Sequence, residues 1–121
     1  MVLSQATHLV ESLFQDGWNT VMVCGNSLFD PADTAPVQMR LCPFADVYHV
    51  TLTPTLETVL ARCAGQPGRD PARLAADVEL LGRKPHPGSA QLNNSTMTPE
   101  QTLTELVRLV DSGAGHLSSS P

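Results

Sequence analysis

The chain has 121 residues and a formal net charge of −5. This length predicts one domain, since single domains commonly contain about 100–150 residues. The negative charge argues against a general nucleic-acid-binding protein, which must neutralise phosphates. We expect a single domain over residues 1–112, followed by a disordered Gly/Ser-rich tail over residues 113–121.

The three cysteines, Cys24, Cys42 and Cys63, are widely separated and form no C-x-x-C pair. This spacing favours neither a zinc site nor a disulfide framework, and it is typical of a reducing compartment. No apolar run reaches membrane-spanning length, and no secretory leader pattern opens the chain. We therefore expect a cytoplasmic protein with no membrane or nucleic-acid partner and no metal site.

The N-terminal third predicts a helix and then a strand. Residues 3–16 form the helix, because five apolar residues recur on one of its faces: Ala6, Leu9, Val10, Leu13 and Phe14. Gly17 stands where a C-terminal helix cap is expected. The run NTVMVCG is short, apolar and rich in β-branched residues, so it predicts a buried strand over residues 20–24.

The run NSLFDPADTAP, residues 26–36, predicts an exposed loop because it contains two prolines and several turn-forming residues. A short helix is expected over residues 37–41. The run DVYHVTLTP then predicts a second strand over residues 47–52, with one apolar and one mixed face. His49 lies on the mixed face, where we expect a packed, hydrogen-bonded histidine and not a catalytic base.

The second half of the chain predicts three helices. Thr53 and Pro54 are suited to the N-cap and first position of one helix. The break AGQPG ends that helix, and Asp70-Pro71 begins another. The run SAQLNN predicts at most a short strand. Thr98 forms a capping box with Gln101 at the start of the last helix, whose apolar stripe comprises Leu103, Leu106, Val107 and Val110.

Strands of the buried type therefore alternate with amphipathic helices. This order predicts an α/β fold with a mostly parallel sheet flanked by helices in three layers. Ligands of such folds gather beyond the carboxyl ends of the strands. In this chain those ends are residues 25–30, Thr53 and residues 93–95.

The basic residues are concentrated around the AGQPG break. Five of the seven lie between positions 62 and 84: Arg62, Arg69, Arg73, Arg83 and Lys84. A local cationic cluster in an acidic chain suits a small anion better than a long polyanion. The alternative is ordinary surface charge, in which Arg73 would pair with Asp77 one helical turn away. Arg83 and Lys84 are expected to be plain loop charges.

The pattern over residues 3–110 resembles the later part of P-loop small-molecule kinases. That group includes chloramphenicol phosphotransferase-like, gluconate kinase-like and shikimate kinase-like proteins and their AAA-type relatives. The resemblance is carried by GWNTVMVCGNSLF, FADVYHVTLTPTLETVLARC, the Arg-bearing break and LNNSTMTPEQTLTELVRLV. It implies an ATP- and Mg²⁺-dependent transfer of a phosphoryl group to a small hydroxyl-bearing molecule.

The resemblance also implies roles for individual residues. Arg62 at a helix end, with Arg69 and Arg73 on a mobile lid, would bind the nucleotide phosphates, since a planar guanidinium contacts two oxygens at once. Asn94 and Ser95, in the loop before the last helix, would lie near the nucleotide base.

On the acceptor side, the resemblance implies that Asn26 and Ser27 face the phosphoryl acceptor and that Asp30 is its base. Ser27 also follows an expected strand in CGNSLF, as in the G-x-S-x-G nucleophile elbow of hydrolases. Phe29 occupies the position of the second glycine, which argues against acyl-transfer chemistry. An Asp before Pro, such as Asp30, is also a common turn residue.

The chain departs from the kinase pattern in one respect. A phosphate loop requires G-x-x-x-x-G-K-[ST], and the only lysine, Lys84, is followed by Pro85. The family's first strand, which normally lies between the strands matching 20–24 and 47–52, has no counterpart here. We therefore expect a P-loop-kinase-like domain, missing its first strand and phosphate loop, that does not catalyse alone.

The expected loss of a central strand exposes hydrogen-bonding edges of the sheet, which would favour self-association. The alternative interpretation is a non-catalytic α/β module that binds an anion or a partner chain. A strand and phosphate loop encoded upstream of Met1 would favour the kinase interpretation.

Overall fold

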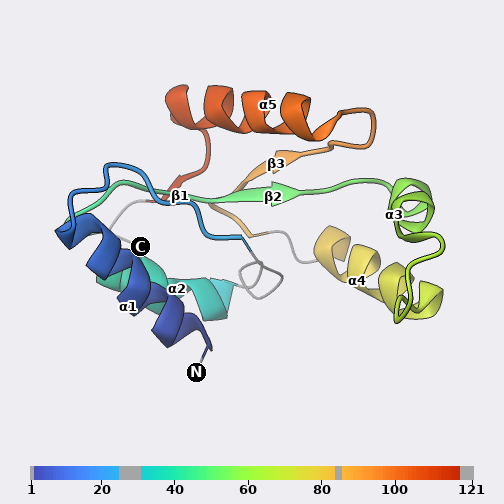
Figure 1. Cartoon of the computed structure of the whole chain (residues 1–121), viewed down its shortest axis with the longest axis horizontal. Coiled ribbons are helices and arrows are strands. Elements are labelled where there is room, and N and C mark those ends of the chain that lie inside the picture. Colours follow the sequence, from blue (N-terminus) through green and yellow to red (C-terminus); the bar gives the residue numbers. More distant parts are fainter. Residues whose placement is uncertain (1, 25–30, 84–85, 118–121) are drawn as a thin grey trace.

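A computed structural model describes residues 2–24, 31–83 and 86–117 of the chain. It is a mixed α/β structure, and its elements are shown in Figure 1. In chain order they are α1 (Val2–Gln15), α2 (Pro31–Leu41), β1 (Val47–Tyr48), β2 (Val50–Leu52), α3 (Leu56–Cys63), α4 (Pro71–Arg83), β3 (Ala90–Leu92), α5 (Pro99–Asp111) and β4 (His116–Leu117).

The first helix agrees with the sequence prediction, and so does its end. Gly17 has a φ of 96°, in the left-handed region that glycine adopts without steric cost. The N–H of Gly17 donates to the carbonyl of Phe14 at 3.0 Å, and the N–H of Trp18 donates to that of Leu13 at 3.2 Å. These bonds satisfy carbonyls that the helix end leaves without partners.

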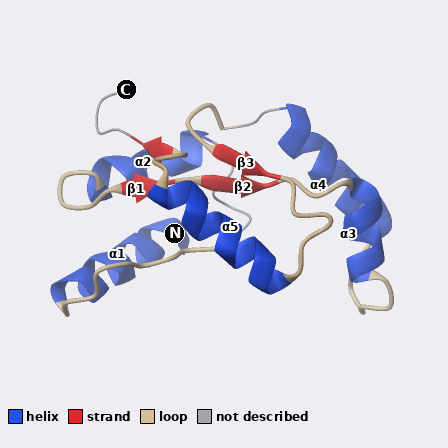
Figure 2. Cartoon of the chain, turned by 90° about the horizontal axis from the view of Figure 1, so that it is seen from above, coloured by secondary structure: helices blue, strands red, loops and turns tan. Residues whose placement is uncertain are grey.

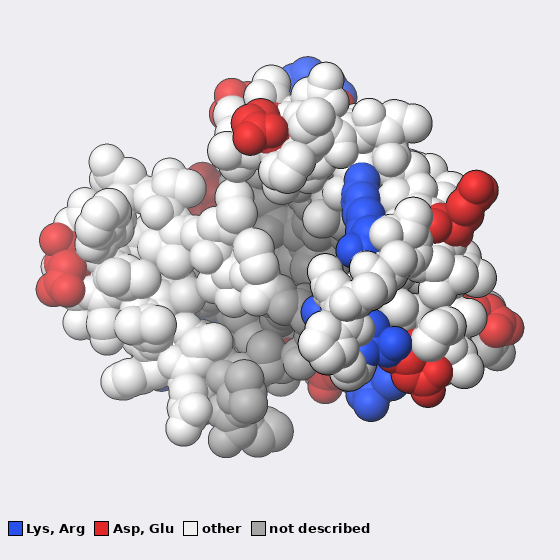
Figure 3. All heavy atoms as spheres, turned by 45° about the vertical axis from the view of Figure 1, so that its right-hand side comes forward, with Lys and Arg blue, Asp and Glu red and all other residues white. Residues whose placement is uncertain are grey.

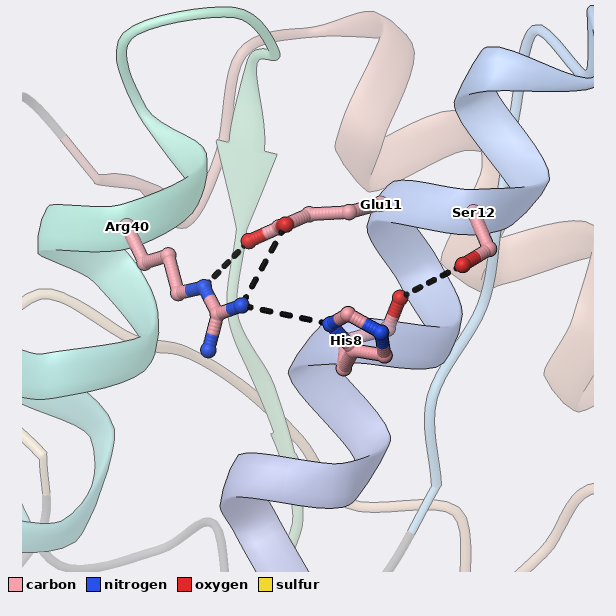
Figure 4. Close-up of polar contacts among 4 residues, drawn as sticks. All are labelled: His8, Glu11, Ser12 and Arg40. Atoms are coloured by element: carbon pink, nitrogen blue, oxygen red, sulfur yellow. Dashed lines mark hydrogen bonds and ion pairs between the residues drawn. The ribbon is translucent and has the colours of Figure 1, made fainter.

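Helix α2 begins earlier than predicted, because residues 31–36, expected to be loop, are helical. Pro31 suits the first helical position, where no N–H is needed and φ is already set. Pro36 lies inside the helix, where its ring removes one backbone hydrogen bond. Figure 4 shows how Arg40 of α2 reaches α1. Its guanidinium forms a two-point ion pair with Glu11 and approaches Nδ1 of His8.

The prediction of a strand over residues 20–24 is wrong. These residues form neither a helix nor a strand, and they belong to neither of the two sheets in the described part of the chain. Figures 1 and 2 show the segment that follows α1 passing beside the sheet, on the side of β2 that faces away from β3. A strand exists only when its backbone groups pair with a neighbour, and no described strand lies next to this one.

The strand predicted over residues 47–52 is divided at His49. β1 pairs with β4 in antiparallel register, Val47 opposite Leu117. β2 pairs with β3 in parallel, Val50 opposite Ala90 and Leu52 opposite Leu92. The predicted sheet is thus confirmed only as an α/β structure that contains one parallel pair.

The C-terminal segment causes this division. The N–H of His49 donates to the carbonyl of Gly115 at 2.8 Å, and Gly115 has a φ of 76°. A Cβ at Gly115 would lie 2.3 Å from the carbonyl oxygen of His49, so only glycine fits there. Residues 113–117, which we expected in a disordered tail, therefore form a turn and a strand, and Leu117 is buried. Residues 118–121 lie outside the described residues.

The three later helices begin at the signals that the sequence carries, with one correction. Thr98 and Gln101 form the predicted capping box of α5. The N–H of Gln101 donates to Oγ1 of Thr98 at 3.1 Å, and the N–H of Thr98 donates to Oε1 of Gln101 at 2.9 Å. The carboxylate of Asp70 accepts from the N–H of Ala72 at the start of α4. The N-cap of α3 is Thr55 and not Thr53. The N–H of Thr53 instead extends the strand pair by donating to the carbonyl of Leu92 at 2.8 Å.

The packing of the chain is incomplete. Helix α5 lies across one side of β2 and β3, while α1 with α2 and α3 with α4 form pairs at opposite ends (Figures 1 and 2). Among the residues whose burial is described, the buried apolar side chains are Val10, Leu41, Leu92 and Leu117. The accessible surface is 8411 Å², whereas a compact monomer of 12.9 kDa exposes about 6300 Å². Across the described ranges, no helix combines the length and apolar character needed to cross a bilayer.

Candidate functional site

The carboxyl ends of the parallel pair form the candidate site. β2 ends at Leu52 and leads directly into α3, and β3 ends at Leu92 and leads through residues 93–98 into α5. Because parallel strands end at the same edge of a sheet, the start of α3 and the 93–98 segment lie together there. Ser95 joins them, since its hydroxyl oxygen accepts from the N–H of Thr55 at 2.9 Å.

Arg62, in the last turn of α3, reaches this segment. Its Nη2 donates to the carbonyl oxygen of Asn94 at 2.8 Å, and the carbonyls of Ser95 and Met97 lie 3.4 Å away. The structure thus brings together Arg62, Asn94 and Ser95, whose roles in nucleotide binding stay predictions. Nη2 of Arg62, however, donates to the backbone carbonyls of this turn.

The turn that Arg62 holds has its own internal bonds. The N–H of Ser95 donates to Oδ1 of Asn93 at 3.0 Å, and the N–H of Met97 donates to the carbonyl of Asn94 at 3.1 Å. Asn and Ser favour such turns because their side chains bond nearby backbone groups. These bonds and the guanidinium fix the backbone of Asn94 from both sides.

The side chain of Asn94 is the unusual feature of the site. It is only 8% exposed, and its buried Oδ1 has no hydrogen-bond partner among the residues that the structure describes. A buried acceptor left unpaired costs about 1–3 kcal/mol, and most buried polar groups in proteins are paired. Because Oδ1 has less than 1 Å² of exposed surface, a ligand that donates a hydrogen bond to it would remove this cost only after the atoms that cover it move aside.

Arg69 and Arg73 are not part of the same arrangement. Arg69 lies in the turn between α3 and α4, Arg73 lies in the first turn of α4, and both are exposed. Among the ion pairs of the described residues, none joins Arg73 to Asp77. Figure 3 brings the α3–α4 end forward and shows its cations lying among carboxylates. The face in this view shows no continuous basic surface among the described residues.

Two shallow hollows of the described chain lie elsewhere. One, of about 510 Å³, follows the start of α5 and is lined by Thr96, Met97, Glu100, Gln101, Thr104 and Glu105. The other lies between α1 and Phe44. Neither is lined by the three arginines assigned to phosphate, and the two carboxylates of the first hollow disfavour an anion there.

The predicted acceptor-side residues, Asn26, Ser27 and Asp30, lie outside the described residues, as does Lys84. Their predicted roles stay untested. Within the described ranges, no group of three or more His, Cys, Asp or Glu side chains is arranged to hold a metal ion.

A second polar cluster, which the sequence did not reveal, joins the amino ends of β2 and β3 to α2. Nδ1 of His86 accepts from the N–H of Gly88 at 3.1 Å. His86 therefore carries its proton on Nε2, which donates to the hydroxyl oxygen of Thr34 at 2.8 Å. The rings of His86 and His49 are stacked, with centroids 4.5 Å apart.

Ser89 completes this cluster. Its Oγ lies 2.7 Å from Nδ1 of His49 and 2.8 Å from Oγ1 of Thr51, and it also contacts the carbonyls of His49 and Ala90. A hydroxyl makes at most three such bonds, so this one is saturated by its neighbours. We interpret the serine–histidine pair as a structural link between the strands. His49 is the half-buried, hydrogen-bonded residue that the sequence predicts.

Comparison of the whole chain with protein-family models, curated proteins and solved structures gave no match. The resemblance to P-loop kinases therefore stays a hypothesis that depends on the sequence pattern.

Proposed function

We propose that this chain is a nucleotide-binding α/β domain of the P-loop-kinase type that binds the base of a nucleotide and does not transfer phosphate alone. The observation that carries the proposal is the buried Oδ1 of Asn94, which has no hydrogen-bond partner in the described part of the chain. It belongs to a loop at the carboxyl edge of a parallel strand pair, where α/β folds bind ligands.

The chemistry of Asn94 selects the kind of base. Oδ1 accepts a hydrogen bond, so the matching ligand group is an N–H donor. The exocyclic amine of adenine is such a donor, which agrees with the ATP implied by the kinase resemblance. Sites built to pair with a ligand N–H discriminate strongly against analogues that lack it, because the protein group is then left unpaired.

Arg62 serves this function indirectly. Its contacts with the carbonyls of Asn94, Ser95 and Met97 hold the loop in place. The exposed Arg69 and Arg73 are the residues proposed to contact the phosphates of Mg²⁺-bound ATP. Phosphoryl transfer to an acceptor near Asn26, Ser27 and Asp30 would further require the phosphate loop that the sequence lacks.

Calorimetric titration with two nucleotides tests the proposal. We expect Mg-ATP to bind at least about tenfold more tightly than the Mg complex of purine riboside triphosphate, which lacks the amine. Asn94→Ala should remove this preference. Gln91→Ala, an exposed amide in the neighbouring strand, is the control and should retain it. The absence of binding by any nucleotide would contradict the proposal.

One observation favours a second candidate, a protein-interaction module. The chain exposes about 2000 Å² more than a compact monomer of its mass. A binding module and a nucleotide site can coexist in one domain, so the two functions are tested separately.

A further inference from the structure

The edge of β2 that faces away from β3 has backbone groups that pair with no described strand. The carbonyl of His49 accepts from the N–H of Ala90 at 3.0 Å, and the N–H of Thr53 donates to Leu92. Because alternate residues of a strand point to opposite edges, the N–H and C=O groups of Val50 and Leu52 point away from β3. Among the described residues, these groups have no backbone partner.

The sequence of β2 itself carries no residue that protects this edge. Proteins guard open edges with charged side chains, prolines or bulges. Residues 47–53, which include all of β2, contain no Lys, Arg, Asp, Glu or Pro. The side chain of Leu52 is 39% exposed. An unprotected, apolar edge is suited to pairing with another strand.

The same chain carries a strand-like segment without a sheet. Residues 20–24 (TVMVC) form neither a helix nor a strand, are uncharged and are rich in β-branched residues. Met22 is 61% exposed and Val23 is 46% exposed, although both are apolar. No backbone hydrogen bond of the described residues involves this segment. It therefore has the composition of a buried strand and lacks only a partner.

The chain as a whole exposes enough surface for a stable interface. Leu103 and Val107 lie one turn apart on α5, which crosses the sheet, and both are exposed. The surplus surface of about 2000 Å² exceeds the roughly 800 Å² that each partner buries in a standard interface.

We propose that the two unpaired features pair between two copies of this chain. Residues 20–24 of each copy add as a strand to the open edge of β2 in the other copy. The reciprocal exchange forms a two-fold symmetric dimer. In it, each 20–24 segment pairs with one β2 edge, so neither segment nor edge is left without a partner. This interaction is independent of the proposed nucleotide site, because Asn94 lies beyond the carboxyl end of β3.

Sedimentation velocity over about a hundredfold range of concentration tests the assembly, because the dimer population depends on concentration. We expect a monomer–dimer equilibrium. Hydrogen exchange gives a second readout, since the amides of Val50 and Leu52 should become protected as dimer forms. A monomer at every concentration, or unprotected amides in the dimer, would overturn the proposal.

Three variants identify the surfaces. Val50→Pro removes an N–H that points to the open edge and spares the bonds to β3. Met22→Lys places a charge in the exchanged segment. Each should weaken dimerisation by about tenfold or more. Met39→Lys makes the same change at a methionine of α2 that is 74% exposed, and it should have no effect. Equal dimerisation of the two Met→Lys variants would overturn the proposal.

A mixing experiment distinguishes strand exchange from direct pairing of two β2 edges. Val50→Pro retains an intact exchanged segment, and Met22→Lys retains an intact edge. A mixture can therefore form one complete strand pair and should associate more tightly than either variant alone. If the mixture is no tighter, or if Met22→Lys alone dimerises like the unaltered chain, the exchange does not occur. Circular dichroism checks that each variant is folded.

Discussion

Nη2 of Arg62 lies 2.8 Å from the carbonyl oxygen of Asn94. The kinase resemblance assigns Arg62 to phosphate and Asn94 to the nucleotide base. In the structure the first residue holds the backbone of the second. Arg62 is thus a positioning residue for the proposed base site.

Replacement of Arg62 by lysine tests this role. Lysine keeps the charge but cannot contact three carbonyls with a planar group. We expect Arg62→Lys to weaken nucleotide binding as much as Arg62→Ala, and each to lower the free energy of unfolding by about 1 kcal/mol. Calorimetry and urea denaturation measure the two effects. If Arg62→Lys bound ATP almost normally, a direct charge contact with phosphate would explain the residue better.

Replacement of Asn94 should have little effect on stability in the absence of ligand. Its Oδ1 is buried and no described residue bonds to it, so its removal eliminates a desolvation cost. We expect Asn94→Ala to change the free energy of unfolding by less than about 1 kcal/mol while it abolishes nucleotide selectivity. A loss of several kcal/mol in urea denaturation would show that the amide serves the fold and not a ligand.

Replacement of Gly115, with Gly68 as the control position, tests the contact between the C-terminal segment and His49. Both have positive φ, 76° and 79°, but an added Cβ would contact the His49 carbonyl only at Gly115. We expect Gly68→Ala to cost about 1 kcal/mol through backbone strain. Gly115→Ala should cost at least about 3 kcal/mol, since the β1–β4 junction must also open. Similar unfolding midpoints for the two variants would contradict the junction described here.

Cys42 is expected to ionise less readily than a cysteine in an unfolded chain. Burial raises the pKa of its thiol, and the nearby carboxylate of Asp46 raises it further. Its S–H also donates to the carbonyl of Leu117. In a variant with Cys24 and Cys63 replaced by serine, the alkylation rate should rise at a higher pH in the native state than in urea.

The same shift has a consequence for stability. Folding raises the pKa of the Cys42 thiol, so the folded state favours the protonated thiol and gains stability from it. This gain in the free energy of unfolding is fully present below the pKa of an unfolded cysteine, about 8.5. It is lost as the pH rises through the higher folded value. Cys42→Ala should therefore show a smaller alkaline loss of stability than the unaltered chain, and identical curves would exclude this linkage.

Signals that depend on neighbouring residues were predictable from the sequence. Gly17 ends α1 and the Thr98–Gln101 capping box begins α5, because each acts on backbone groups a few positions away. The pairing of distant segments was not predictable. The strand expected over 20–24 is unpaired, and the strand over 47–52 is divided because Gly115 and β4 dock at His49.

For the candidate site, too, only part of the arrangement was predictable from the sequence. The sequence pattern placed Arg62, Asn94 and Ser95 at one edge, because α/β topology gathers the strand ends there. It could not reveal that Arg62 binds carbonyls, since that depends on the path of the 94–97 turn. The burial of Asn94 and the cluster of His49, His86 and Ser89 likewise arise from packing between distant segments.

The affinity difference between Mg-ATP and Mg-purine riboside triphosphate for the unaltered chain is the most direct test of the account. Calorimetry should show that ATP binds at least about tenfold more tightly, since only its amine can donate to Oδ1 of Asn94. Equal affinities, or no binding of either nucleotide, would contradict the proposed base site. Neither result would affect the dimer, whose test is sedimentation.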